Sequence, residues 1–193
     1  MATKNQGGTM TEEKEQNGSV ANGKFKNHKT LNELLEEGLK DIYSAEKQLV
    51  EALPQMAQAA DSEDLQEAIT NHLEQTQKQV SRLEKIFNRL NISKEGGEKC
   101  VAMEGLIEEG KKILTEFDRS PVRDSALIIG AQKIEHYEIA AYGSLRELAD
   151  VLREDKIVDI LQRTLDEEEE ADQTLTEIAQ DVNDEAYEMS EQD

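Results

Sequence analysis

Residues 31–53, LNELLEEGLKDIYSAEKQLVEAL, decide the fold class of this 193-residue chain. Apolar side chains recur in this stretch at spacings of three and four residues, which is the period of one helix face. Between Ile42 and Leu49 the series places Glu46 where an apolar residue is expected. A carboxylate that faces a helical core is costly unless something neutralises its charge, so Glu46 is a candidate for a binding role. The apolar series consists of Leu31, Leu35, Leu39, Ile42, Leu49 and Leu53.

The same helical period continues along the rest of the chain, and no strand-like alternation interrupts it. Thr30 and Glu33 have the spacing of a capping box, which begins the first helix. Ser120 and Pro121 have the residue types of an N-cap and a first helical position. The pattern therefore predicts an all-α protein, a bundle of four long helices with one extra short helix. The further expected helices are 62–90, 101–117, 121–153 and 156–182.

The two ends of the chain differ from the helical part in composition. Residues 1–28 contain four glycines and polar residues without any period, which predicts a disordered N-terminal arm. No lysine or arginine follows Arg163, and residues 183–193 are expected to form a disordered acidic tail. The bundle is therefore assigned to residues 29–182. Solubility or salt tolerance is the simplest interpretation of so acidic an end.

Composition excludes several classes of function. A formal net charge of −21 argues against binding to nucleic acid or to an anionic membrane, because both require clustered lysine and arginine. No apolar run approaches the roughly 20 residues that span a bilayer, and the N-terminus has no hydrophobic signal region. Cys100 is the single cysteine, so it cannot form an internal disulfide. These features predict a cytoplasmic protein.

Interruptions like that of Glu46 occur on each long helix. Glu138 lies in the middle of the apolar stripe of the third long helix, and Glu135 lies one turn earlier at its margin. Glu168 and Asp172 are one turn apart within the stripe of the fourth. Inward positions of all four long helices therefore carry acids or, on the second helix, a histidine. The candidate metal ligands are Glu46, His72, Glu135, Glu138, Glu168 and Asp172.

These side chains also fall at related depths if the helices pair as hairpins. A turn near residue 154 brings Glu138 level with about residue 170, between Glu168 and Asp172. A turn near residue 61 brings Glu46 level with about residue 76, so His72 is one turn away from the ideal level. Several oxygen donors with one imidazole suit a pair of iron or manganese ions, because carboxylates can bridge two cations. Without metal the same carboxylates would repel one another and their pKa values would rise.

A simpler interpretation stays open at this point. In a chain with 43 acidic residues, one glutamate within an apolar stripe is usually a boundary residue that reaches solvent. A single histidine such as His72 is more often a core residue than a ligand. Tyr142 is expected to pack, and His136 points away from the stripe and is left out of the site. In the acidic run 166–170 only Glu168 is expected to point inward.

Five segments of the chain, in order, resemble the YciF family, a group of bacterial ferritin-like proteins associated with stress. The resemblance covers about residues 29–180. It implies a ferritin-like antiparallel four-helix bundle with a short extra helix, a dinuclear iron or manganese site, and a homodimer. It also implies that Glu46, Glu135, Glu138, Glu168 and Asp172 are ligands, with His72 as the donor from the second helix. The segments are DIYSAEKQL (41–49), HLEQT (72–76), CVAMEGLIE (100–108), QKIEHYEI (132–139) and TLDEEE (164–169) followed by Ala171 and Asp172.

One departure from the ferritin pattern bears on the chemistry. Ferritins and rubrerythrins use Glu-x-x-His pairs, whereas this chain has Glu74 with Gln77 and Glu169 with Asp172 at that spacing. A site with at most one histidine is richer in carboxylates, and this leaves the metal and its oxygen chemistry open. Three functions remain: a stress protein whose two metal ions handle peroxide or oxidise Fe(II), a metal buffer, and a structural or interaction bundle with a vestigial site.

Overall fold

The computed structural model describes Met1 and residues 29–191, and this part of the chain is built from helices without any strand. The all-α prediction is therefore confirmed, and the expected helix boundaries agree closely except at the C-terminal end. No helix in the described part is both long enough and apolar enough to cross a membrane. The helices are α1 (Leu31–Ala59), α2 (Glu63–Leu90), α3 (Val101–Glu116), α4 (Pro121–Val151) and α5 (Asp155–Ser190).

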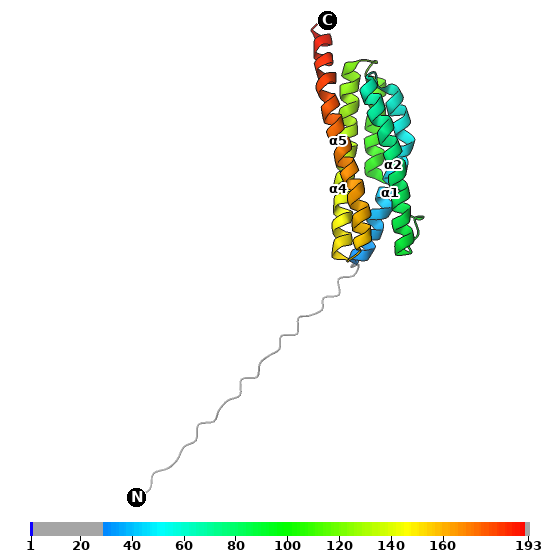
Figure 1. Cartoon of the computed structure of the whole chain (residues 1–193), viewed down its shortest axis with the longest axis vertical. Coiled ribbons are helices and arrows are strands. Elements are labelled where there is room, and N and C mark those ends of the chain that lie inside the picture. The colour runs from blue at the N-terminus through cyan, green and yellow to red at the C-terminus, as the bar shows by residue number, and fades with distance from the viewer. Residues whose placement is uncertain (2–28, 192–193) are drawn as a thin grey trace.

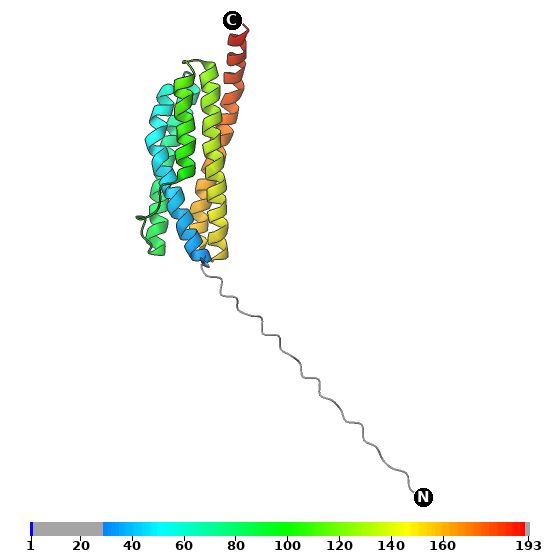
Figure 2. The same ribbon diagram turned by 180° about the vertical axis from the view of Figure 1, so that it is seen from behind.

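Two helical hairpins form the bundle. Figure 1 shows α1 running antiparallel to α2, and α4 running antiparallel to α5. The hairpins pack with α1 against α4 and α2 against α5. The short helix α3 lies in the connection between the hairpins and packs against α1 and α4, on the side that faces the viewer in Figure 2. This arrangement gives the antiparallel four-helix bundle with one extra helix that the sequence led us to expect.

Local sequence signals explain where the helices begin. The Thr30 side chain accepts a hydrogen bond from the Glu33 amide at 3.2 Å, and Glu33 accepts one from the Thr30 amide at 2.7 Å. This is the capping box that the sequence predicts, and it satisfies two amides at the start of α1. Ser120 accepts a hydrogen bond from the Arg123 amide at 3.3 Å, with Pro121 following it as the first residue of α4.

The core is aliphatic and the helices approach closely where a residue is small. Leu39, Ile42 and Leu49 are completely buried on the inner face of α1. At Gly38, a Cβ atom would lie 2.6 Å from Cδ2 of Leu145, so the side chain of Leu145 occupies the space beside the α1 backbone. A larger residue at position 38 would displace the side chain of Leu145 from this space.

The C-terminal end corrects one expectation. Helix α5 continues to Ser190, so the prediction of a disordered tail over 183–193 is wrong for its residues up to that point. Val182 is only 4% exposed, and Ala186 is half-buried, so part of this region still packs. Once a helix is established, each added residue gains a hydrogen bond at little cost, and Glu, Ala and Met are good helix formers. The expected arm at 1–28 falls, except for Met1, on residues that the structure does not describe.

Candidate metal centre

Four buried side chains meet inside the bundle. His72 comes from α2, Glu135 and Glu138 come from α4, and Glu168 comes from α5. Each offers one nitrogen or oxygen atom, and these atoms all lie within 4.8 Å of one another. None of the four side chains belongs to a residue more than 6% exposed. The sequence analysis named all four, and the structure brings them together.

His72 faces two of the carboxylates. Its Nε2 atom lies 3.5 Å from Oε1 of Glu135 and 4.0 Å from Oε2 of Glu168. Burial lowers the pKa of His72 to about 4, so the imidazole is neutral at pH 7. Neutral imidazole is the form that binds metal ions. The one-turn difference in depth that the sequence suggested for His72 does not keep it from this cluster.

The remaining long helix, α1, contributes Glu46, which lies near these four side chains. It is completely buried, and its Oε1 atom accepts a hydrogen bond from the hydroxyl of Tyr142 on α4. Burial raises the pKa of Glu46 well above its usual range, and among nearby charges that of Glu168 raises it most. In turn, among the neighbouring charges, that of Glu46 raises the pKa of Glu138 most. Tyr142, which the sequence assigned to packing, therefore also orients a candidate ligand.

The cluster carries more acid than its surroundings neutralise. Burial, followed by repulsion from neighbouring carboxylates, raises the pKa values of Glu46, Glu135 and Glu138 well above their usual range. Burial also raises the pKa of Glu168, to about 7. Both side-chain oxygens of Glu138 lack a hydrogen-bond partner, as does one oxygen of each of the other three. Native proteins rarely leave buried polar atoms unpaired, so this donor set fits bound cations.

Two expected ligands, Glu46 and Asp172, lie outside the group of four, and Asp172 is the one that is not fully buried. It is half-buried, and its Oδ1 atom lies 3.3 Å from Nε2 of His136 and 3.3 Å from the Gln132 amide nitrogen. It remains close enough to raise the pKa of Glu135 by its charge. Asp172 follows Glu168 by one turn on the same face, but its side chain is one methylene shorter and pairs with groups near the surface of α4.

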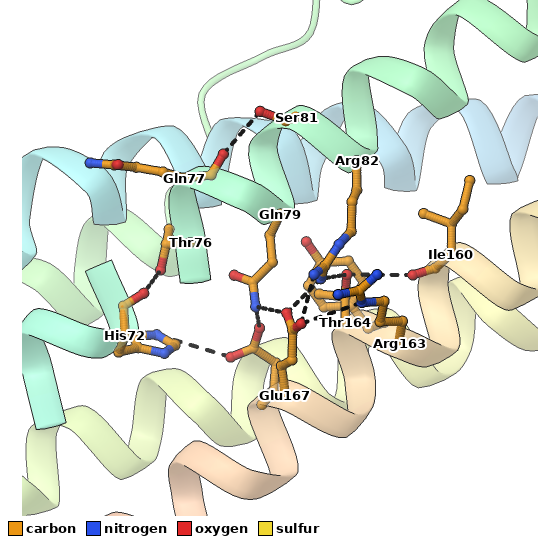
Figure 3. Close-up of polar contacts among 12 residues, drawn as sticks. His72, Thr76, Gln77, Gln79, Ser81, Arg82, Ile160, Arg163, Thr164 and Glu167 are labelled. Atoms are coloured by element: carbon orange, nitrogen blue, oxygen red, sulfur yellow. Dashed lines mark hydrogen bonds and ion pairs between the residues drawn. The ribbon is translucent and has the colours of Figure 1, made fainter. Parts of the chain in front are cut away.

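The structure adds a network of four residues, Gln79, Arg82, Thr164 and Glu167, that the sequence did not single out as site residues, shown in Figure 3. The Gln79 amide of α2 donates hydrogen bonds to Oε1 of Glu168 at 2.5 Å and to Oε2 of Glu167 at 3.3 Å. Arg82 binds Glu167 with both terminal nitrogens, one of them at 2.6 Å from Oε1. Arg82 also donates to the Thr164 hydroxyl at 3.2 Å. Gln79 thereby holds a candidate ligand in place.

This network does not neutralise the cluster. Burial raises the pKa of Glu167, but the hydrogen bonds and charge of Arg82 outweigh burial, and the net pKa is lowered. The guanidinium is therefore largely engaged by Glu167, and only its longer-range charge reaches Glu46 and Glu168. The sequence signal for Gln79 and Arg82 is their spacing of three residues, which places both on one face of α2. Val80, which follows Gln79 on α2, is only half-buried.

Comparison with known proteins agrees with this architecture. A family model described as "Domain of unknown function (DUF892)" matches residues 30–188. Protein YciF of Escherichia coli (strain K12) is 44% identical over 153 residues, which cover 79% of this chain and 92% of that protein. The resemblance noted in the sequence is therefore confirmed.

Solved structures give the same result. The crystal structure of the E. coli stress protein YciF superposes with a TM-score of 0.78 at 42% identity, covering 81% of this chain and 99% of that chain. YcfI from Rhodopseudomonas palustris superposes with a TM-score of 0.74 at 43% identity, covering 77% and 94%. YcfI is described, provisionally, as a structural protein.

Proposed function

The chain belongs to the DUF892 family, and we propose that its bundle binds two iron or manganese ions that handle peroxide or oxidise Fe(II) during stress. The observation that carries this proposal is the buried cluster itself. Three glutamates and a neutral imidazole from α2, α4 and α5 meet in this cluster, and the buried Glu46 of α1 is close enough to raise the pKa of Glu138 by its charge. The cation beside them, Arg82, is engaged by Glu167. Bound divalent cations would remove the repulsion and satisfy the unpaired oxygens.

The chain's own residues define what would hold the ions. Glu46, Glu135, Glu138 and Glu168 supply oxygen donors, which iron and manganese prefer, and His72 supplies one nitrogen. Tyr142 and Gln79 orient two of these carboxylates through hydrogen bonds, as residues behind metal ligands commonly do. Asp172 lies at the edge of this set. We therefore place it among residues that support the site and not among its principal ligands.

The chemistry follows from the electron count. Two Fe(II) ions would supply the two electrons that reduce hydrogen peroxide, with two protons, to two molecules of water. In the absence of metal, the raised pKa values of Glu135 and Glu138 keep protons on these carboxyl groups. Metal binding would release these protons.

The setting of this activity is also a proposal. The described relative from E. coli is called a stress protein, which supports a stress role for this chain. We further propose a homodimer in the cytoplasm whose substrate is a small oxidant, without nucleic acid or membrane as partner. The net charge of −21 supports the exclusion of both polyanionic partners.

A structural bundle with a vestigial site is the second candidate. The provisional structural role of YcfI supports it, as does the Arg82, Gln79 and Glu167 network, which joins α2 to α5 without metal. In that case metal would not stabilise the protein, because only a ligand that binds the native state shifts the unfolding equilibrium.

The test is metal content per chain, measured by elemental analysis of protein purified without an affinity tag and then loaded with Fe(II) or Mn(II). We expect about two ions per chain, the number used by dinuclear sites. Glu138→Gln should lower this content, whereas Glu74→Gln, on the exposed face of α2, should not. Absence of bound metal under both loading conditions would reject the proposal in favour of the structural bundle.

A further inference from the structure

A pocket of about 200 Å³ opens between α2 and α5 and reaches the candidate metal centre. His72 and Glu135 form part of its lining, so it extends from the surface to two members of the buried cluster. Ala68 of α2 and Ala171 of α5 also line it, and both are only half-buried. Their short side chains leave space between the two helices at this level. The pocket is therefore a feature of the α2–α5 contact that shares His72 and Glu135 with the metal centre, while its other lining residues are not proposed ligands.

The lining has an apolar part and a polar part. Leu53, Ile69 and Leu175 supply buried apolar side chains, each no more than 5% exposed. His72 and Glu135 supply polar atoms, and both ring nitrogens of His72 and Oε2 of Glu135 lack hydrogen-bond partners. A molecule with an apolar body and one hydrogen-bonding group would match both parts. It would bury its body against the aliphatic side chains and satisfy a polar atom that is otherwise unpaired.

Size and charge narrow the class of molecule. A volume of 200 Å³ exceeds the roughly 150 Å³ of an engineered protein cavity that binds benzene, so a body of several carbon atoms fits. Glu135 and Glu170 line the pocket, and among the described residues no lysine or arginine does. An anion would therefore meet the charge of Glu170 with no lysine or arginine in the described lining to balance it. A cation would have to shed water against Leu53, Ile69 and Leu175, which is costly.

We propose that this pocket binds small uncharged molecules that have an apolar body and one hydroxyl or hydroperoxyl group. The inference deepens the proposed function, on which it rests for its consequence: the bound polar group is delivered to the metal centre. The substrate class would then include small organic hydroperoxides as well as hydrogen peroxide. Binding itself depends only on the pocket, so it can be measured without metal.

Three molecules with the same trimethyl body test the proposal: tert-butanol is neutral, pivalate is an anion and tert-butylammonium is a cation. Each is titrated into the full-length metal-free chain while the methyl resonances of Leu53, Ile69 and Leu175 are followed by NMR. We expect saturable shifts with tert-butanol at roughly millimolar affinity, since so small a ligand has little binding energy. Pivalate should cause no saturable shift, and tert-butylammonium should bind more weakly than the alcohol.

Two variants locate the binding. Ala171→Leu and Ala68→Leu fill the pocket from opposite sides, and each should weaken tert-butanol binding at least about tenfold, equivalent to about 1.4 kcal/mol. Ala140→Leu is the matched control on the exposed face of α4 and should bind as the unmodified chain does. Because two variants fill the pocket independently, misfolding of one still leaves a test.

The contrary outcomes are distinct. Absence of saturable shifts with tert-butanol would overturn the proposal that the pocket binds such molecules. So would tert-butanol binding that is as tight in both filling variants as in the unmodified chain. Equal binding of pivalate, or tighter binding of tert-butylammonium, would overturn the uncharged class. A chain that binds tert-butanol but no metal would reject the proposed function alone, whereas one that binds metal but not tert-butanol would reject this inference alone.

Discussion

Glu138 shows at the scale of a single residue why this bundle is not optimised for stability alone. Its side chain is completely buried, and neither oxygen has a hydrogen-bond partner. Burial and the charges of Glu46, Glu168 and Glu135 raise its pKa well above the usual range. An apolar residue of similar size would remove these costs, so the presence of Glu138 indicates a functional demand.

Glu138→Leu should therefore stabilise the metal-free protein while removing metal binding. We expect the free energy of unfolding at pH 8 to rise by about 1–3 kcal/mol, because a buried unpaired carboxyl is replaced by an apolar group. Denaturant unfolding in the presence of a chelator measures the change. Glu169→Leu, at an exposed position of α5, is the control and should have little effect. A destabilised metal-free Glu138→Leu protein would show that the carboxyl has a structural partner.

Tyr142→Phe tests the residue that holds Glu46. It removes the hydroxyl that donates to Oε1 of Glu46 but retains the buried ring. Loss of such a supporting hydrogen bond typically lowers metal affinity by about 10–100-fold, and we expect an effect of this size. Competition with a metal-binding dye provides the measurement. Tyr187→Phe, on an exposed turn of α5, should retain full affinity, and an unchanged affinity in Tyr142→Phe would exclude the orienting role.

At the scale of the helices, Asp124 joins the two hairpins. It is 1% exposed on α4 and accepts hydrogen bonds from the backbone amides of Asp61, at 2.9 Å, and Ser62, at 2.7 Å. These amides lie at the turn between α1 and α2, where backbone donors lack helical partners. One carboxylate thus anchors the first hairpin to the second and sets the depth at which their side chains meet.

Asp124→Ala should destabilise the protein by about 1–3 kcal/mol, since it leaves part-buried amides without a charged acceptor. Denaturant unfolding would measure the loss, with Asp118→Ala at an exposed position nearby as the control. Asp124→Asn retains an acceptor oxygen and should lose less. A loss below roughly 0.5 kcal/mol, the usual range for surface changes, would contradict the anchoring role of Asp124.

For the molecule as a whole, the buried acids make stability depend on pH in an unusual direction. A glutamate whose folded-state pKa is raised keeps a proton that the unfolded chain gives up above about pH 4.5. The folded protein then binds more protons, so its free energy of unfolding falls as pH rises. His72 acts in the opposite direction between about pH 4 and pH 6.5, because its folded-state pKa is lowered to about 4. Above pH 6.5 only the effect of the carboxyl groups remains.

The metal-free protein should therefore lose stability between pH 6.5 and pH 8.5. Glu168, with a pKa of about 7, contributes to the lower part of this range, and Glu46, Glu135 and Glu138 extend the effect upward. Denaturant unfolding across these pH values, with chelator, gives the slope. With Mn(II) present the slope should diminish or reverse, because metal binds the deprotonated ligands. Stability that increases with pH in the metal-free protein would contradict the raised pKa values.

The sequence by itself determined the helical architecture and five of the residues that converge in it. Helical periodicity places Glu46, Glu138 and Glu168 within apolar stripes, and a stripe must face the core whatever the partner helix is. His72 and Glu135 were identified on the same basis. The capping box of Thr30 and Glu33 was equally visible, because it depends only on residues three apart.

Tertiary structure alone decided which polar side chains join the cluster and which pair with other residues outside it. Asp172 shares the face of Glu168, but the position of α4 offers it His136 and Gln132 as partners. Gln79 and Asp124 make their contacts across 89 and 63 positions of sequence. Periodicity gives the direction of a side chain from its own helix, but not its distance to another helix. That distance depends on how the hairpins pack, which is also why the pocket between α2 and α5 has no signature in the sequence.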